Sequence, residues 1–138
     1  MQHESQPQRP ADFDGRRILV TGGTRGIGEA IVERLVRGGG KVLATARSLP
    51  AGVALDRFVQ ADVSTRAGID LVVEATMDRL GGLDILIHNV GGSAAPGGGA
   101  LALADDDWQK AFDVNLFAAV RLDRAFLPSM LQQGSGVI

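Results

Sequence analysis

The chain has 138 residues, a formal net charge of -2 and no cysteine. Its length suffices for one domain with a buried core but not for two, and 45% hydrophobic with 22% charged residues is typical of folded globular domains. The slight negative charge argues against a nucleic acid or an anionic membrane as partner. Without cysteine there are no disulfides or thiolate sites, and because His3 and His88 are far apart we predict no metal site.

The first twelve residues are rich in glutamine, proline and charge and contain no apolar run. They resemble neither a signal peptide nor a membrane span, so the default expectation is a cytoplasmic protein. We predict a disordered tail over residues 1–12 and a single ordered domain over 13–138.

From residue 17 onward, short β-branched runs alternate with longer amphipathic stretches, a pattern typical of βαβ units. The predicted strands occupy 17–21, 41–46, 57–61 and 83–90, and the predicted helices 26–37 and 64–80. Ser64 is the predicted N-cap of the second helix. We therefore expect an α/β fold, a doubly wound parallel sheet with helices on both faces and its first strand in the centre.

A glycine- and alanine-rich segment, 91–104, predicts a mobile loop, and a long helix is expected over 105–133. The apolar residues of that helix fall into two groups. One side carries Trp108, Phe112, Leu116, Ala119 and Phe126, and another carries Ala111, Val114, Ala118, Leu122 and Ala125. A helix that is apolar on two sides is buried on two sides, so we predict a homo-oligomer, a dimer or tetramer, formed through this helix.

The most informative motif is TGGTRGIG, Thr21 to Gly28, between a predicted strand and a predicted helix. Glycines there let backbone N–H groups approach a pyrophosphate, to which the helix N-terminus adds partial positive charge. Gly22 permits the turn, Gly26 the close approach and Gly28 the packing of helix on strand. The motif indicates a Rossmann-type dinucleotide site; the alternative is a structural glycine turn without a ligand.

The end of the second predicted strand bears on which dinucleotide binds. An NAD site carries a carboxylate there to hold the ribose 2'-hydroxyl, whereas an NADP site replaces it with positive charge. This chain has Arg47 at that place and Arg25 in the glycine loop. Two guanidinium groups can hold a 2'-phosphate, so NADP(H) is the predicted cofactor. The alternative is that Arg47 is solvated and Arg25 caps a loop.

The spacing TGxxxGxG resembles the cofactor fingerprint of the short-chain dehydrogenase/reductase family. Asp62-Val63, Asn89-Val90-Gly91 and Asn115 also resemble family motifs, so the resemblance spans residues 16–138. It implies cofactor binding by Gly22, Thr24, Arg25, Gly26, Ile27, Gly28, Arg47, Asp62, Val63, Asn89 and Gly91. In the family the acid after the third strand bonds the adenine, although Asp62 could also be a simple helix N-terminal acid. The resemblance implies that Asn115 is catalytic, bending its helix and holding a water in a proton relay.

Two features depart from the family pattern. His88 and Val90 stand where the family more often has Asn and Ala, and we interpret His88, with no paired carboxylate in view, as a local substitution. The family's proton donor is a tyrosine followed four residues later by a lysine, beside a serine on the fifth strand. This chain has no tyrosine, and Ser135 lies in a Gly-Ser-Gly turn.

The predicted function is that of an NADP(H)-dependent oxidoreductase, which reduces a carbonyl or oxidises an alcohol of a small substrate. Val137-Ile138 resemble the opening of a fifth strand, so we expect the chain to be truncated there, and inactive alone. The alternative function is that of a non-catalytic nucleotide-binding or dimerisation module.

Overall fold

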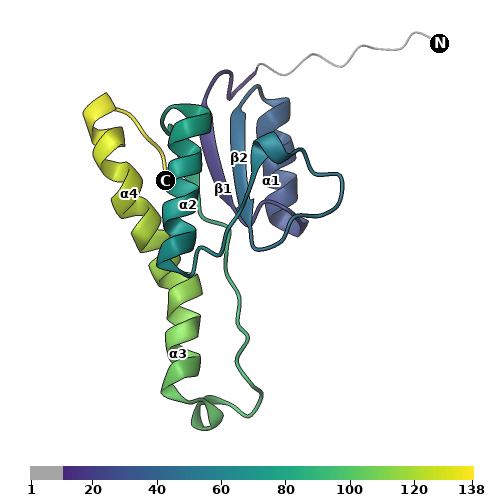
Figure 1. The fold of residues 1–138 in the computed structure, drawn as a ribbon, viewed down its shortest axis with the longest axis vertical. Helices are drawn as coiled ribbons and strands as arrows, with labels where there is room; N and C mark the ends of the chain where they lie inside the picture. Colours follow the sequence, from purple (N-terminus) through teal and green to yellow (C-terminus); the bar gives the residue numbers. More distant parts are fainter. Residues whose placement is uncertain (1–10) are drawn as a thin grey trace, which may run out of the picture.

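A computed structural model describes residues 11–138; most of the predicted tail, residues 1–10, lies outside this range. Four parallel strands form one sheet in the order β3-β2-β1-β4 (Figure 1). They are β1 (Arg17–Thr21), β2 (Lys41–Ala46), β3 (Phe58–Gln60) and β4 (Ile85–Ile87). The predicted α/β sheet with a central first strand is confirmed. The outer strands are shorter than predicted because their flanking residues have no strand partner in the described chain.

Helices cover both faces of the sheet, as predicted (Figure 1). One face holds α1 (Gly26–Arg37), and the other holds α2 (Arg66–Leu80) and α4 (Ala118–Gln133). The helix α3 (Asp105–Phe112) and the π-helical segment η3 (Asp113–Phe117) lead directly into α4, and the short helices η1 (Leu55–Arg57) and η2 (Ala100–Ala102) lie in connecting segments. Within residues 11–138, no helix is both long and apolar enough to cross a membrane.

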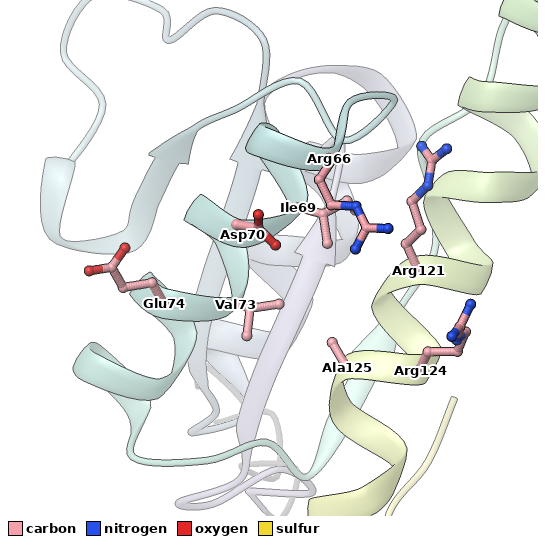
Figure 2. A pocket seen from close by; sticks show the side chains of 8 residues that line it. All are labelled: Arg66, Ile69, Asp70, Val73, Glu74, Arg121, Arg124 and Ala125. Atoms are coloured by element: carbon pink, nitrogen blue, oxygen red, sulfur yellow. The ribbon is translucent and has the colours of Figure 1, made fainter.

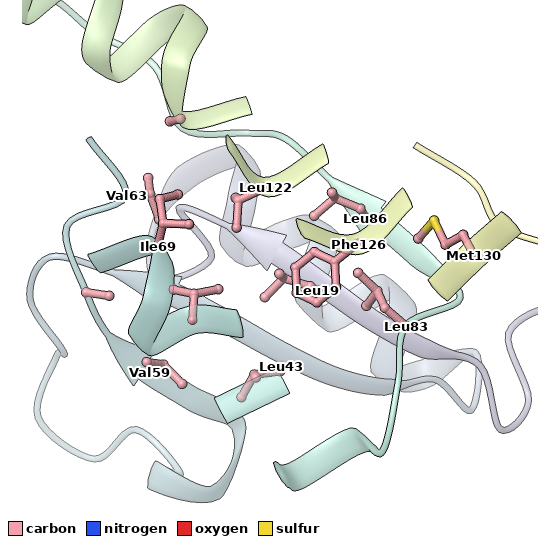
Figure 3. Packing of buried hydrophobic residues seen from close by; sticks show 13 residues of the cluster. Leu19, Leu43, Val59, Val63, Ile69, Leu83, Leu86, Leu122, Phe126 and Met130 are labelled. Atoms are coloured by element: carbon pink, nitrogen blue, oxygen red, sulfur yellow. The ribbon is translucent and has the colours of Figure 1, made fainter. Parts of the chain in front are cut away.

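The larger hydrophobic core lies between the sheet and the pair α2 and α4 (Figure 3). From α4, Leu122 and Phe126 reach toward Leu19 of β1 and Leu86 of β4, and all four side chains are buried. A smaller core lies under α1 on the opposite face. The two layers leave the carboxyl ends of the strands free at one edge of the sheet.

The helical segment over 105–133 is confirmed, but its predicted division into two apolar sides is wrong for Phe126. Phe126 is buried in the same stripe as Ala118, Leu122 and Met130, whereas Trp108 and the apolar residues near it are exposed. The reason is η3, whose wider turn accommodates one extra residue and shifts the phase of the residues that follow. A single periodicity of 3.6 residues therefore cannot be drawn through the whole segment.

The start of α2 also differs by one residue from the prediction. Thr65, not Ser64, is the N-cap, and its hydroxyl accepts a hydrogen bond from the Gly68 N–H at 3.0 Å. Ser64 instead donates to the carboxylate of Asp62. The first turn packs so closely under Asp62 that a Cβ on Gly68 would collide with the Asp62 carbonyl.

The described chain begins at residue 11, before β1. Asp12, assigned to the tail by composition, forms an ion pair with Arg34 of α1 at 2.6 Å. The Arg34 guanidinium also lies over the Phe13 ring, 5.3 Å from its centroid. These contacts attach the segment before β1 to the surface of α1.

At the end of the sheet opposite the strand carboxyl ends, Arg17 and Asp84 form a two-pronged ion pair. Arg17 Nη2 donates to Asp84 Oδ1 at 2.8 Å and Nε to Oδ2 at 3.0 Å. The hydrogen bond from the Arg17 side chain lowers the pKa of Asp84 to about 2. Next to Asp84, Val137 makes an isolated parallel bridge with Ile85.

Candidate functional site

A cleft with a volume of about 980 Å³ opens at the carboxyl ends of the strands. It lies where β1 and β4 are neighbours but their connections leave in opposite directions, the usual ligand position in a doubly wound sheet. All eleven residues that sequence analysis assigned to cofactor binding line this one cleft: Gly22, Thr24, Arg25, Gly26, Ile27, Gly28, Arg47, Asp62, Val63, Asn89 and Gly91. Other residues that line the cleft were not predicted from the sequence, among them Ser48, Leu49, Pro50 and Val114.

The glycine loop is held from both sides. On the β2 side, the N–H groups of Gly22 and Gly23 donate to the Thr45 carbonyl at 2.7 and 3.2 Å. On the β4 side, Asn89 Nδ2 donates to the Gly22 carbonyl at 3.0 Å. Gly22 has φ of +71°, a conformation that glycine adopts without strain. The loop is thus fixed by the two strands that flank β1.

The packing of α1 against the loop depends on Gly28. A Cβ at this position would lie 2.5 Å from Asn89 Nδ2 and closer still to the Gly22 carbonyl oxygen. By contrast, a Cβ on Gly26, with φ of +55°, would meet nothing within 4 Å. Gly28 therefore serves helix packing, whereas Gly26 leaves open space at the cleft.

The N-terminus of α1 faces the cleft, and no side chain within residues 11–138 caps it. Arg25 is the N-cap residue and forms no capping hydrogen bond, and an arginine side chain has no acceptor to offer the first N–H groups. Unsatisfied amides at a helix N-terminus attract anions. A lining that combines these amides with the open space at Gly26 fits the pyrophosphate of a dinucleotide.

Two guanidinium groups lie at the same cleft. The Arg25 and Arg47 side chains are exposed and form no hydrogen bond or ion pair with residues 11–138. The Arg47 backbone is held, since its carbonyl accepts from Gln60 Nε2 at 3.0 Å. In the described chain, Asp62 is the only acidic residue among those that line the cleft.

Asp62 follows β3, and its carboxylate is oriented by an Asx turn. Oδ1 accepts hydrogen bonds from the Ser64 N–H at 3.0 Å and from the Ser64 hydroxyl at 2.7 Å. Oδ2 accepts none from the part of the chain that the structure describes. One oxygen is thus fixed by the protein while the other is available to a donor in the cleft.

Beyond β4, the side chain of Thr21 fixes the strand end. Its Oγ1 accepts from the N–H groups of Asn89 at 3.0 Å and Val90 at 3.2 Å. Sequence analysis assigned no side-chain role to Thr21, although its place at the end of a buried strand was the available signal. Val90, a departure from the family pattern, thus keeps a backbone contact at the strand end.

His88 does have a carboxylate partner, contrary to the sequence interpretation. Its Nε2 lies 2.7 Å from Asp123 Oδ1, and both side chains are partly buried between β4 and α4. The partner lies 35 positions away on another element, so no local motif could have revealed it. The pair links α4 to the segment after β4 that contains Asn89.

Asn115 lies in η3, at the edge of the cleft and not among its lining residues. Its amide forms a reciprocal pair with the Gly92 backbone, donating to the carbonyl at 2.7 Å and accepting from the N–H at 3.0 Å. It also donates to the Ala111 carbonyl at 2.9 Å. Because the π-helical turn interrupts the regular hydrogen-bond pattern, the helix offers this carbonyl to a side chain. Asn115 thereby fixes the start of the loop after β4.

The chain is similar in sequence and in fold to known proteins. Residues 16–138 match the family model described as short chain dehydrogenase. The chain belongs to the short-chain dehydrogenase family. It is 33% identical over 133 residues to the 3-oxoacyl-acyl-carrier-protein reductase FabG of Salmonella typhimurium, covering 91% of this chain and 54% of that protein. It is 35% identical over 144 residues to a fatty acyl-CoA reductase of Mycobacterium tuberculosis, covering 94% of this chain and 48% of that protein.

Two solved reductase structures have a similar fold. The NADH-dependent reductase A1-R', complexed with NAD, superposes with a TM-score of 0.80 at 29% identity, over 92% of this chain and 59% of that one. L-sorbose reductase from Gluconobacter frateurii, complexed with NADPH and L-sorbose, gives 0.78 at 30% identity, over 91% and 51%. The chain thus spans about half the length of the relatives that it matches.

Proposed function

We propose that residues 13–138 form the NADP(H)-binding part of a short-chain dehydrogenase that reduces a carbonyl, or oxidises an alcohol, of a small substrate. When bound, the cofactor supplies or accepts the hydride. The chain's own residues hold the cofactor through the glycine loop, the N-terminus of α1 and the ends of β2, β3 and β4. The family's tyrosine has no counterpart in this sequence, so the proposal assigns no proton donor within it.

The observation that carries the cofactor proposal is the charge at the end of β2. Arg47 and Arg25 face one cleft, and no carboxylate stands at the position where an NAD site needs one. A 2'-phosphate would accept charge-assisted hydrogen bonds from both guanidinium groups, whereas a 2'-hydroxyl would leave them unused. NADP(H) is therefore the better match to these residues.

We also propose that Asn115 is a positioning residue, which holds the loop after β4 in place. Its hydrogen bonds with Gly92 hold the loop that follows β4, whose residue Gly91 lines the cleft. The family resemblance implies a second role for Asn115, which is to hold a water in a proton relay. The hydrogen bonds that both amide atoms of Asn115 form with Gly92 support the positioning role.

The exposed apolar side of α3, η3 and α4 supports the proposal of a homo-oligomer. Seven large side chains on it are more than a third exposed: Trp108, Phe112, Leu116, Phe117, Val120, Leu127 and Leu131. Monomeric proteins rarely leave so many neighbouring apolar side chains in water. A second copy of the chain, packed helix against helix, would cover them.

The cofactor proposal is tested by titrating the intact protein with NADPH and NADH and following the fluorescence of the reduced cofactor. Arg47→Asp should weaken NADPH binding about tenfold to a hundredfold, as expected for losing charge-assisted bonds, and leave NADH binding nearly unchanged. Arg57→Asp is the matched control, because Arg57 is exposed on η1 and does not line the cleft.

Equal losses for both cofactors in Arg47→Asp would overturn the assignment of the 2'-phosphate. A wild-type protein that binds neither cofactor would overturn the dinucleotide site itself and would favour a dimerisation module. Competition by 2',5'-ADP but not by 5'-ADP would support the assignment without requiring turnover.

A further inference from the structure

Asp62 is connected to α4 by a series of hydrogen bonds that passes through Ser64 and Arg121. Its Oδ1 is held by Ser64, and its carbonyl accepts from the Thr65 hydroxyl at 2.9 Å and the Thr65 N–H at 3.1 Å. The close approach of Gly68 leaves this turn no room to move toward α2. The carboxylate is therefore aimed by the turn that contains it.

An arginine from another helix holds the turn that contains Asp62 and Ser64. Arg121 of α4 donates from Nη1 to the Ser64 carbonyl at 2.9 Å and from Nη2 to Asp113 Oδ1 at 3.3 Å. Its guanidinium also lies 5.5 Å from the centroid of the Phe117 ring. With 29% of the side chain exposed, Arg121 is partly removed from water. Its planar fork can satisfy both acceptors only in a fixed orientation.

Figure 2 shows the groove next to Arg121. A groove of about 450 Å³ separates α2 from α4, and Arg66, Arg121 and Arg124 all project into or beside it. Of the three, Arg121 alone has side-chain hydrogen bonds to other residues within 11–138. Arg121 therefore connects η3, which contains Asn115, with the turn that aims Asp62.

We propose that Arg121 is a positioning residue for recognition of the adenine ring. By holding Ser64 it keeps the free oxygen of Asp62 directed at the exocyclic amino group of an adenine in the cleft. The inference rests on the proposed dinucleotide site and adds to it a residue that lines the neighbouring groove and does not line the cleft. It also makes the adenine end of the site dependent on the placement of α4.

The test is a cycle between a protein variant and a cofactor variant. Arg121→Gln is titrated with NADPH and with the analogue that carries hypoxanthine in place of adenine and so lacks the exocyclic amino group. Arg121→Gln should weaken NADPH binding about threefold to tenfold, the usual range for one hydrogen bond, and the hypoxanthine analogue less than twofold. Arg124→Gln, one turn further along the groove, is the matched control and should change neither affinity.

Ser64→Ala provides a second variant in case Arg121→Gln does not fold, as judged by thermal unfolding. It removes the hydroxyl that holds Asp62 Oδ1 and should show the same selective loss. Equal losses for both cofactors, no loss for either, or a wild-type protein indifferent to the amino group would each overturn the role of Arg121. If the wild-type protein binds neither ligand, the dinucleotide site fails instead, so the two failures are distinguishable.

Discussion

Replacing Gly28 by alanine tests the close packing of α1 on the glycine loop. The added Cβ would lie 2.5 Å from Asn89 Nδ2 and 2.9 Å from the Gly22 carbonyl carbon. The Gly22 carbonyl oxygen would lie closer still, and since non-bonded heavy atoms settle near about 3.5 Å, α1 must retreat by more than about 1 Å. Overpacking of this kind costs about 1–3 kcal/mol, and loss of the hydrogen bond between Asn89 and Gly22 adds about 1 kcal/mol.

The sum, about 2–4 kcal/mol, corresponds to a decrease in Tm of about 8–16 °C for a chain of this size. Circular dichroism during heating measures it on the intact protein. Gly26→Ala is the matched control. Its Cβ meets nothing within 4 Å, so only the positive φ costs stability, about 1 kcal/mol, while NADPH binding weakens because the methyl group enters the cleft. Equal Tm losses in the two variants would refute this account of Gly28.

Three further predictions concern other contacts. Because the folded-state pKa of Asp84 is lowered to about 2 from 3.8, its ion pair with Arg17 contributes about 2 kcal/mol above pH 4, which is lost as pH falls toward 2. Asp84→Asn should flatten that part of the unfolding free energy measured against pH, and an unchanged slope would contradict the assignment. His88→Asn and Asp123→Ser should each lower the unfolding free energy by about 1 kcal/mol, and a double-mutant cycle in urea should show a coupling free energy that differs from zero. Leu131→Glu, at a side chain 77% exposed, should shift the protein to a smaller species on size-exclusion chromatography without lowering its Tm; an unchanged elution volume would rule Leu131 out of the interface.

The sheet was predictable because its strands are short apolar runs bounded by glycines. The runs that became β1 and β2 were found with correct bounds, since both strands are paired along their length and buried on both faces. The ends of β3 and β4 were not, because the pattern of apolar residues continues past the last strand partner. η3 was missed for a related reason: the residues of a π-helical turn have no composition of their own, and the turn is visible only in hydrogen bonds.

The candidate site was predictable where a role attaches to a local motif. The sequence placed three features together: the motif TGGTRGIG, Arg47 after β2, and Asp62 after β3. It could do so because the carboxyl ends of parallel strands meet at one edge of the sheet. The contacts that position those residues were not predictable. His88 with Asp123, and Arg121 with Ser64, join elements far apart in sequence, and without a structure nothing distinguishes these side chains from solvated ones.

The π-helical turn of η3 has a consequence for the apolar side chains on either side of it. One extra residue in a helix corresponds to about 100° of rotation, so the winding of η3 sets the direction in which Trp108 and Phe112 point relative to the stripe buried on the sheet. Deleting a residue there would restore a continuous α-helix. It would also rotate α3, and the loop that is hydrogen-bonded to Asn115, about the axis of α4. The direction of the exposed side chains on α3 is thus set by η3, independently of the packing of α4 on the sheet.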